Sequence, residues 1–177
     1  MHAWKDDQMN YPITRLAWKH IYQFASESKE QQLYGSCLNG TMFHWTNEHP
    51  TKIEHIPLNT HNQYHTIDAA GDGQRVVVAG KLNQIEFWNI VAGKMEQCWT
   101  KEEKHCHENT IFTARFFPFN SFNLYSGGWD RIIKFWDVRH GHQTMHCQFT
   151  QTCGDSLDME VGGNLLVSGG GTHGEGI

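Results

Sequence analysis

The sequence predicts an all-β fold assembled from repeated strand units, and three observations support this prediction. Aromatic residues are frequent, with 7 Trp, 10 Phe and 5 Tyr, and 17 glycines stand against 4 prolines among the 177 residues. Short apolar runs end in small residues and a turn, as strands joined by tight turns do. Helical periodicity is scarce: its best candidate, residues 27–33 (ESKEQQL), is short and polar, and we expect a loop with no more than one helical turn there.

Strand runs follow one another along the whole chain. The clearest is IIKFWDV (132–138), in which Ile132, Lys134 and Trp136 alternate with residues of the opposite face. Further runs are ITRLAW (13–18), QLYGS (32–36), HTIDAA (65–70), QRVVVAG (74–80), IFTARFF (111–117) and NLLVSGG (164–170).

The runs repeat. Segments 33–45, 77–89 and 124–137 each contain an apolar pair, small residues, a turn with Asn or Asp, and a strand that ends at Trp. The separations of these tryptophans, 88 − 45 = 43 and 136 − 88 = 48 residues, are close to the roughly 40–45 residues of a four-stranded propeller blade. A fourth copy begins at residues 154–170.

The repeats predict an incomplete β-propeller of about three and a half four-stranded antiparallel blades. The predicted units are residues 11–50, 51–100, 105–150 and a partial unit at 151–177, and residues 1–10 are a candidate outer strand of a further, missing blade. An open arc of blades leaves apolar faces at its ends, which a second copy or another chain is expected to cover unless the sequence is a fragment.

The third copy, LYSGGWDRIIKFWD, resembles the repeat of the WD-repeat family, and the resemblance extends from about Tyr11 to the end of the chain. The resemblance implies a polar network in each blade, made in the third copy by His107, Ser126, Asp130 and Trp136. Such a network has a physical purpose, because a buried carboxylate is costly unless it is hydrogen-bonded and a buried indole N–H needs an acceptor.

The other copies depart from this pattern. The first has Asn39 in place of the Asp and Gly35 in place of the Ser. The second aligns Asn83 with the Asp, in a turn one residue shorter, and Ala79 with the Ser. Its loop histidine is either His61 or His65. We therefore expect the third blade to be the most rigid unit.

Candidate partner-binding residues lie in the turns and after the last tryptophan. Trp129 precedes Asp130, and its assigned equivalents are Leu38 and Leu82. An exposed aromatic there would be a binding hot spot, and the alternative is that Trp129 packs on the neighbouring blade. Arg131, in the same turn, is the next candidate.

The segment WDVR (136–139) is similar to the end of a box found in substrate receptors of cullin–RING ubiquitin ligases. The resemblance places Arg139 on the face opposite to Trp129 and makes it the residue on which such a function would depend. Many propellers contain this motif, so it is an alternative and not the principal prediction.

Histidines and cysteines raise the alternative of a metal-binding protein. The chain has 13 His and 5 Cys, clustered at HCH (105–107) and HCQ (146–148), but it lacks the paired CxxC spacing of structural zinc sites. Ser126, His107 and Asp130 are also the residue types of a hydrolytic triad. Residues 167–176 (VSGGGTHGEG) are rich in glycine but lack the GK[ST] ending of a phosphate-binding loop. We therefore predict no catalytic residue, metal or cofactor.

Charge and composition limit the partners. A net charge of −5 disfavours nucleic acid and anionic membranes as partners. The sequence contains no run of 18 apolar residues, and from residues 1–10 we expect no secretory leader. The odd cysteine count favours reduced thiols in the cytoplasm or nucleus. The sequence thus predicts a non-catalytic scaffold or adaptor that binds other proteins or peptides.

Overall fold

The structure, a computed structural model, describes residues 11–22, 29–71, 73–118, 120–154 and 156–170. The prediction of an outer strand at residues 1–10 lies outside this part of the chain. Strands dominate the described residues, and all of the strand pairs are antiparallel.

The strands form three four-stranded sheets and one two-stranded sheet, each in sequence order. The first sheet contains β1 (Ile13–Tyr22), β2 (Lys29–Cys37), β3 (Thr41–Thr46) and β4 (Ile53–Pro57). The second contains β5 (Tyr64–Ala69), β6 (Arg75–Gly80), β7 (Ile85–Asn89) and β8 (Lys94–Trp99). The third contains β9 (Ile111–Phe117), β10 (Asn120–Gly128), β11 (Ile132–Asp137) and β12 (His142–Gln148), and the last contains β13 (Leu157–Met159) and β14 (Leu166–Ser168).

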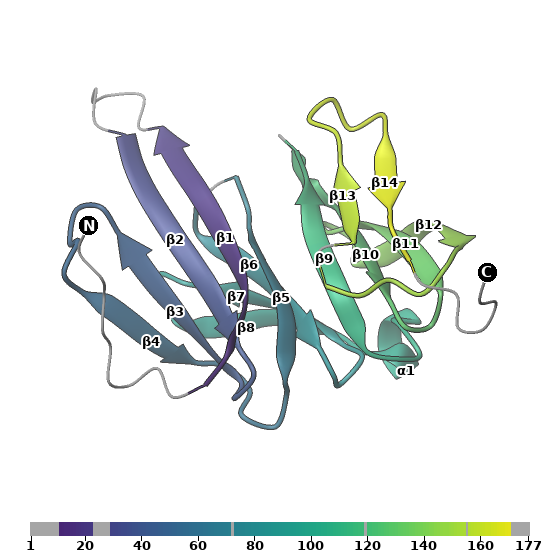
Figure 1. The fold of residues 1–177 in the computed structure, drawn as a ribbon, viewed down its shortest axis with the longest axis horizontal. Helices are drawn as coiled ribbons and strands as arrows, with labels where there is room; N and C mark the ends of the chain where they lie inside the picture. Colours follow the sequence, from purple (N-terminus) through teal and green to yellow (C-terminus); the bar gives the residue numbers. More distant parts are fainter. Residues whose placement is uncertain (1–10, 23–28, 72, 119, 155, 171–177) are drawn as a thin grey trace, which may run out of the picture.

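The sheets stack face to face in an arc (Figure 1). The first strand of each sheet lies on the inner side of the arc, since β1 contacts β5 and β5 contacts β9. This arrangement confirms the predicted all-β, incomplete propeller of four-stranded antiparallel blades.

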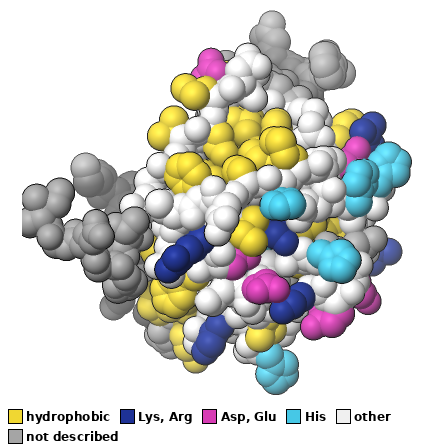
Figure 2. Space-filling view, turned by 90° about the vertical axis from the view of Figure 1, so that its right-hand side faces the viewer, with side chains coloured by type: hydrophobic (Ala, Val, Ile, Leu, Met, Phe, Trp, Pro, Cys, Tyr) yellow, Lys and Arg dark blue, Asp and Glu magenta, His cyan; other side chains and the backbone are white. Residues whose placement is uncertain are grey.

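The hydrophobic core lies between successive sheets. One cluster joins the first and second sheets, with Tyr34 against Ile67 and Val78. A second joins the second and third sheets and includes Trp99 beside Trp136, with ring centroids 5.3 Å apart. A third joins the third sheet to the last hairpin. Hydrophobic side chains also gather on the outer surface at the end of the molecule where β14 lies (Figure 2).

Three details differ from the sequence-based expectations. Residues 29–33 belong to β2 and not to a loop, because all of them pair with β1, residues 32 and 33 also pair with β3, and this pairing outweighs local polarity. Residues 53–57 complete the first sheet instead of beginning the second unit, because Ile53 pairs with Trp45.

The third difference is a one-turn helix, α1 (Lys101–Lys104), before β9. Its N-cap is Thr100, whose hydroxyl oxygen accepts a hydrogen bond from the backbone N–H of Glu103, and acidic residues fill its first turn. The helix ends at His105, which has a left-handed φ of 52°. Within the described residues, no helix is long and apolar enough to span a membrane.

Candidate functional site

The structure brings His107, Ser126, Asp130 and Trp136 together in the third sheet. His107 Nδ1 lies 2.7 Å from Asp130 Oδ2, and its Nε2 lies 2.7 Å from Ser126 Oγ. Trp136 Nε1 donates to the same Ser126 Oγ over 2.8 Å. The four side chains join the loop before β9 to β10, the following turn and β11.

The donors and acceptors of this network have one consistent assignment. The Asp130 carboxylate can only accept, so His107 Nδ1 carries a proton, and the Nε2 of a neutral imidazole then accepts the Ser126 hydroxyl proton while Ser126 Oγ accepts from Trp136. His107 is then neutral and donates from Nδ1 to the Asp130 carboxylate. Burial lowers the pKa of His107 and outweighs the opposing effect of Asp130, which agrees with a neutral imidazole.

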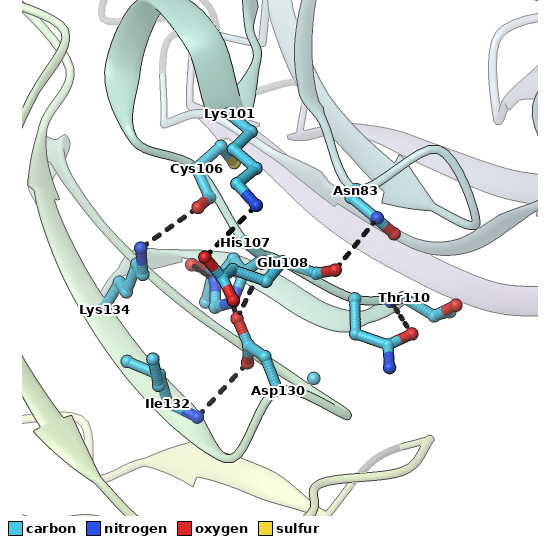
Figure 3. A network of polar contacts seen from close by, with 12 residues as sticks. Asn83, Lys101, Cys106, His107, Glu108, Thr110, Asp130, Ile132 and Lys134 are labelled. Carbon is cyan, nitrogen blue, oxygen red and sulfur yellow. Dashed lines mark hydrogen bonds and ion pairs between the residues drawn. The ribbon is translucent and has the colours of Figure 1, made fainter.

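Asp130 also organises the turn that follows β10. Its Oδ2 accepts the backbone N–H of Glu108 at 3.1 Å, and its Oδ1 accepts that of Ile132 at 3.2 Å (Figure 3). Burial alone would raise the pKa of Asp130, but the hydrogen bonds from His107 and the two backbone N–H groups hold it below its ordinary value. The carboxylate therefore stays charged and fixes the turn on both sides.

Ser126, His107 and Asp130 are connected in the order of a hydrolytic triad, but Ser126 is fully buried. Its oxygen already accepts from Trp136. The geometry therefore gives these residues a role in joining strands, with no face of the hydroxyl open to a substrate.

The second sheet contains a different network, which the sequence analysis missed. Glu86 on β7 is fully buried. Its Oε1 accepts from the side-chain amides of Asn62 (3.3 Å) and Gln84 (2.7 Å). Its Oε2 accepts from Tyr64 Oη (2.6 Å) and Trp88 Nε1 (3.0 Å). Four donors thus satisfy one buried carboxylate.

Neither histidine proposed for the second sheet takes part in this network. His61 is exposed, and its backbone N–H donates to Asn59. His65 stacks on Phe112 of the third sheet, with ring centroids 4.7 Å apart. The loop contribution comes from Asn62, whose Oδ1 also accepts the backbone N–H of Leu82 at 3.1 Å.

The turn geometry corrects the alignment of the second copy. The residue five positions before each strand tryptophan has a left-handed φ: Gly40 (78°), Asn83 (62°) and Arg131 (64°). Asn83 is therefore equivalent to Arg131 and not to Asp130, and the turn is not shorter. Asn83 occupies this position because a left-handed backbone conformation favours Gly and Asn over most other residues.

Counting back from the strand tryptophan also changes which residues of the second sheet are equivalent to Trp129 and Ser126. Leu82 lies at the position of Asp130, and Lys81 lies at that of Trp129, so Leu82 is not an equivalent of Trp129. The backbone agrees, because Lys81 N donates to Gln63 O just as Trp129 N donates to Thr110 O. Val78, and not Ala79, takes the place of Ser126.

The first sheet retains the turn of this network but lacks the serine. Asn39 Oδ1 accepts from the backbone N–H of Thr41 at 3.2 Å, as Asp130 does from Ile132. Gly35 stands at the position of Ser126 and has no side chain to supply a hydroxyl. A serine would not fit there, because its Cβ would lie 1.9 Å from the Phe43 ring. Trp45 Nε1 donates to the carbonyl of Pro50 instead.

Trp129 is held in a row of three aromatic rings, His65, Phe112 and Trp129, which we call the aromatic row. Phe112 lies between the others, 4.7 Å from the His65 centroid and 5.2 Å from that of Trp129. Trp129 Nε1 donates to Cys153 Sγ over 3.2 Å, yet 44% of the residue remains exposed. Trp129 therefore both packs on the next segment and presents a surface.

One cation lies near the aromatic row, and a second belongs to the turn that carries Trp129. Arg131 is exposed in the same turn as Trp129. At the other end, burial lowers the pKa of His65, and the nearby charge of Lys81 lowers it further. Leu38 is half-buried in the turn of the first sheet, where its backbone N–H donates to Pro12.

Arg139 lies at the opposite end of the third sheet. Its Nε and Nη2 donate to the Asp137 carboxylate at 3.2 and 2.7 Å, and its guanidinium lies 5.3 Å from the centroid of Phe122. These hydrogen bonds hold the pKa of Asp137 well below its usual range. The arginine is exposed but fixed in direction.

The histidine and cysteine clusters do not converge. His105 is exposed at the end of α1, whereas Cys106 is buried and burial raises its pKa to about 12. Both ring nitrogens of His107 are engaged by Ser126 and Asp130. Among the described residues, no group of three His, Cys, Asp or Glu side chains is placed to hold a metal ion. The metal alternative therefore gains no support from this geometry.

Comparison with known proteins places this geometry in a family. The family model "WD domain, G-beta repeat" matches residues 99–137, which contain all four members of the His107–Trp136 network. Residues 99–137 are a WD repeat. Autophagy-related protein 16 of Arabidopsis thaliana is 26% identical to it over 98 residues, which are 55% of this chain and 18% of that protein. Coronin-7 of Mus musculus is 29% identical over 99 residues, 55% of this chain and 11% of that protein.

A solved structure shows the same fold. A chain of "Crystal Structure of Mitotic Checkpoint Complex" superposes with a TM-score of 0.71 at 16% identity, over 91% of this chain and 46% of that chain. The chain thus spans less than half of this structural neighbour and less than a fifth of the curated relatives above.

Proposed function

We propose that this chain is a non-catalytic scaffold that binds a segment of another protein across the aromatic row. The observation that supports the proposal is the state of Trp129, which is exposed yet held by Phe112, Cys153 and a capped turn. An aromatic side chain that is ordered before binding loses little conformational entropy when a partner covers it.

The nearby charges favour one class of partner. Lys81 lies near the aromatic row and Arg131 belongs to the turn that carries Trp129, on a chain whose net charge is −5. A segment with an apolar or aromatic residue between acidic residues would match this surface, because the apolar side chain would cover Trp129 and the acidic ones would meet the cations.

Replacing Trp129 with alanine is expected to reduce recovery of specific partners about tenfold or more, because central aromatic hot spots contribute ~2 kcal/mol or more. The measurement is quantitative mass spectrometry of proteins captured from an extract of the native organism by the tagged chain. The matched control is Phe122→Ala, since Phe122 is 50% exposed at the opposite end of the same sheet.

The two variants separate the faces of the molecule. Loss with Trp129→Ala and retention with Phe122→Ala would support binding at the aromatic row. The reverse pattern would place partners at the Arg139 end, and a capture profile that neither variant changes would refute the proposal.

A second candidate function is that of a cullin–RING substrate receptor, which Arg139 would serve. The observation that favours it is an exposed guanidinium whose direction is set by Asp137 and Phe122. Arg139→Ala is then expected to abolish pulldown of the ligase adaptor, with Arg131→Ala as the matched control. Unchanged adaptor recovery by the Arg139 variant would remove this candidate.

A further inference from the structure

Four exposed histidines lie on the outer strand of the third sheet and on the helix before that sheet. His140 and His142 stand at the start of β12, His146 lies further along β12, and His105 ends α1. Histidine side chains are visible across the side of the molecule at which β12 lies (Figure 2). The second and third sheets, which α1 connects, both have four strands, so this surface does not lie at either end of the arc.

A hollow of about 510 Å³ opens between α1 and the start of β12. It is lined by Glu103, His105, Gly141, His142 and Gln143. The histidines continue beyond it. The rings of His140 and His142 have centroids 5.8 Å apart, and Gln143 Nε2 lies 2.8 Å from His146 Nδ1. The four histidines, His105, His140, His142 and His146, therefore form one continuous surface, which we call the histidine face.

The charged groups around the histidine face nearly balance while its histidines are neutral. Among the described side chains of α1, the loop after it, β11 and the turn before β12, they are Lys101, Lys134 and Arg139 against Glu102, Glu103, Glu108 and Asp137. Arg139 is paired with Asp137 at 2.7 Å, and Lys101 with Glu108 at 3.2 Å. Lys134 Nζ donates to two backbone carbonyls. At neutral pH the surface therefore carries no excess of positive charge.

Protonation of the histidines changes this balance. Histidine side chains gain a positive charge as the pH falls from about 8 to 5, and a protonated ring offers two N–H donors. His140 already lies beside a carboxylate: its Nδ1 is 3.4 Å from Asp137 Oδ2, and its side chain is 66% exposed. Among the described contacts, the side chains of His105 and His142 have no hydrogen-bond partner. In mild acid the histidine face thus presents clustered positive charge and free donors.

We propose that the histidine face binds an acidic segment of a partner protein in mildly acidic conditions and releases it near neutral pH. The histidines extend from the end of a helix, across the hollow, to a strand, so several carboxylates along an extended segment can meet them at once. A single small anion in the hollow would meet only His105 and His142, beside the carboxylate of Glu103. Near neutral pH the remaining carboxylates, on a chain with a net charge of −5, favour release.

The test is the affinity of the full chain for a rhodamine-labelled hexa-aspartate peptide, measured by fluorescence anisotropy at about pH 5.5 and about pH 7.5 and at one ionic strength. Aspartate carboxylates ionise near pH ~3.9, so the probe stays charged at both values. We expect binding to be about tenfold or more tighter at the lower pH. EDTA in both buffers removes metal ions that would bridge the peptide to histidine, and circular dichroism at both pH values checks the fold.

Two double variants decide where the peptide binds. His140→Ala combined with His142→Ala is expected to lose most of the gain at the lower pH, about fivefold or more. The matched control combines His49→Ala with His61→Ala, which removes two exposed histidines from the loops on either side of β4. This control should keep the gain, because it lowers the number of histidines equally without touching the histidine face.

Three results would each overturn the proposal. They are no binding or equal affinity at the two pH values, equal losses in the two double variants, and displacement of the peptide by inorganic phosphate at the same concentration. The last result would indicate a site for a compact anion and not for a protein segment. Trp129→Ala should leave peptide binding unchanged, so failure here and failure of the proposal for the aromatic row are distinguishable.

Discussion

Replacing Glu86 with glutamine will lower the free energy of unfolding by about 2–4 kcal/mol, because a buried donor is left without an acceptor. The Glu86 carboxylate accepts from four donors. A glutamine has the same shape, but an NH₂ group replaces one of the two carboxylate oxygens. The two donors that bonded to that oxygen then face another donor. If the NH₂ group replaces Oε2, it faces the Trp88 indole N–H, which cannot become an acceptor. If it replaces Oε1, it faces two side-chain amides.

The measurement is urea unfolding followed by tryptophan fluorescence and far-ultraviolet circular dichroism at one fixed protein concentration, since association would add to apparent stability. The matched control is Glu96→Gln, where the exposed carboxylate accepts only from Asn89 among the described contacts. We expect a change below about 0.5 kcal/mol for this control. Equal, small effects at both positions would mean that the second sheet does not depend on the Glu86 network.

The sequence could predict the third sheet because its network uses a fixed spacing within one hairpin. Ser126, Asp130 and Trp136 lie four and six residues apart, and strand pairing returns Trp136 toward Ser126. His107 comes from the preceding loop, but it belongs to the same repeat. The fold class could be predicted because the strand tryptophans recur at the spacing of a propeller blade, which indicates that similar four-stranded sheets follow one another along the chain.

The second network could not be found by aligning residue types. Such an alignment matches Asn83 to Asp130 because both are polar turn residues, although backbone conformation places Asn83 with Arg131. A usable signal was nevertheless present. Glu86 and Lys134 each stand two residues before a strand tryptophan, and a charged residue on the tryptophan side of a buried strand requires buried partners.

The two charges at this shared position are satisfied in opposite ways. Glu86 gathers side-chain donors, whereas Lys134 Nζ donates to the backbone carbonyls of His105 and Cys106 at 2.6 and 3.1 Å. The first sheet has Phe43 at the same register position. The blades therefore share a backbone plan but differ in what fills it, which residue-by-residue transfer from one repeat to another does not anticipate.

Asp130→Ala is the second substitution with a large expected effect, and it also links stability to the proposed interaction surface. Removing the carboxylate leaves the buried His107 Nδ1–H without an acceptor and releases the backbone N–H groups of Glu108 and Ile132. We expect a loss of about 2–4 kcal/mol in urea unfolding. Asp158→Ala, which removes an exposed carboxylate paired with Arg115, should cost less than about 1 kcal/mol.

The pH dependence gives this prediction a second readout. The folded-state pKa of Asp130 lies below its ordinary value of 3.8, so its contribution to stability is complete above that value and is lost as the pH falls through the folded-state pKa. The difference between wild type and Asp130→Ala should therefore be full at neutral pH and shrink only in strong acid. A difference that disappears between pH 7 and 5 would contradict a charged Asp130. Because the same carboxylate caps the turn that presents Trp129, the variant should also lose the partners that Trp129→Ala loses, and retention of those partners would separate the network from the binding surface.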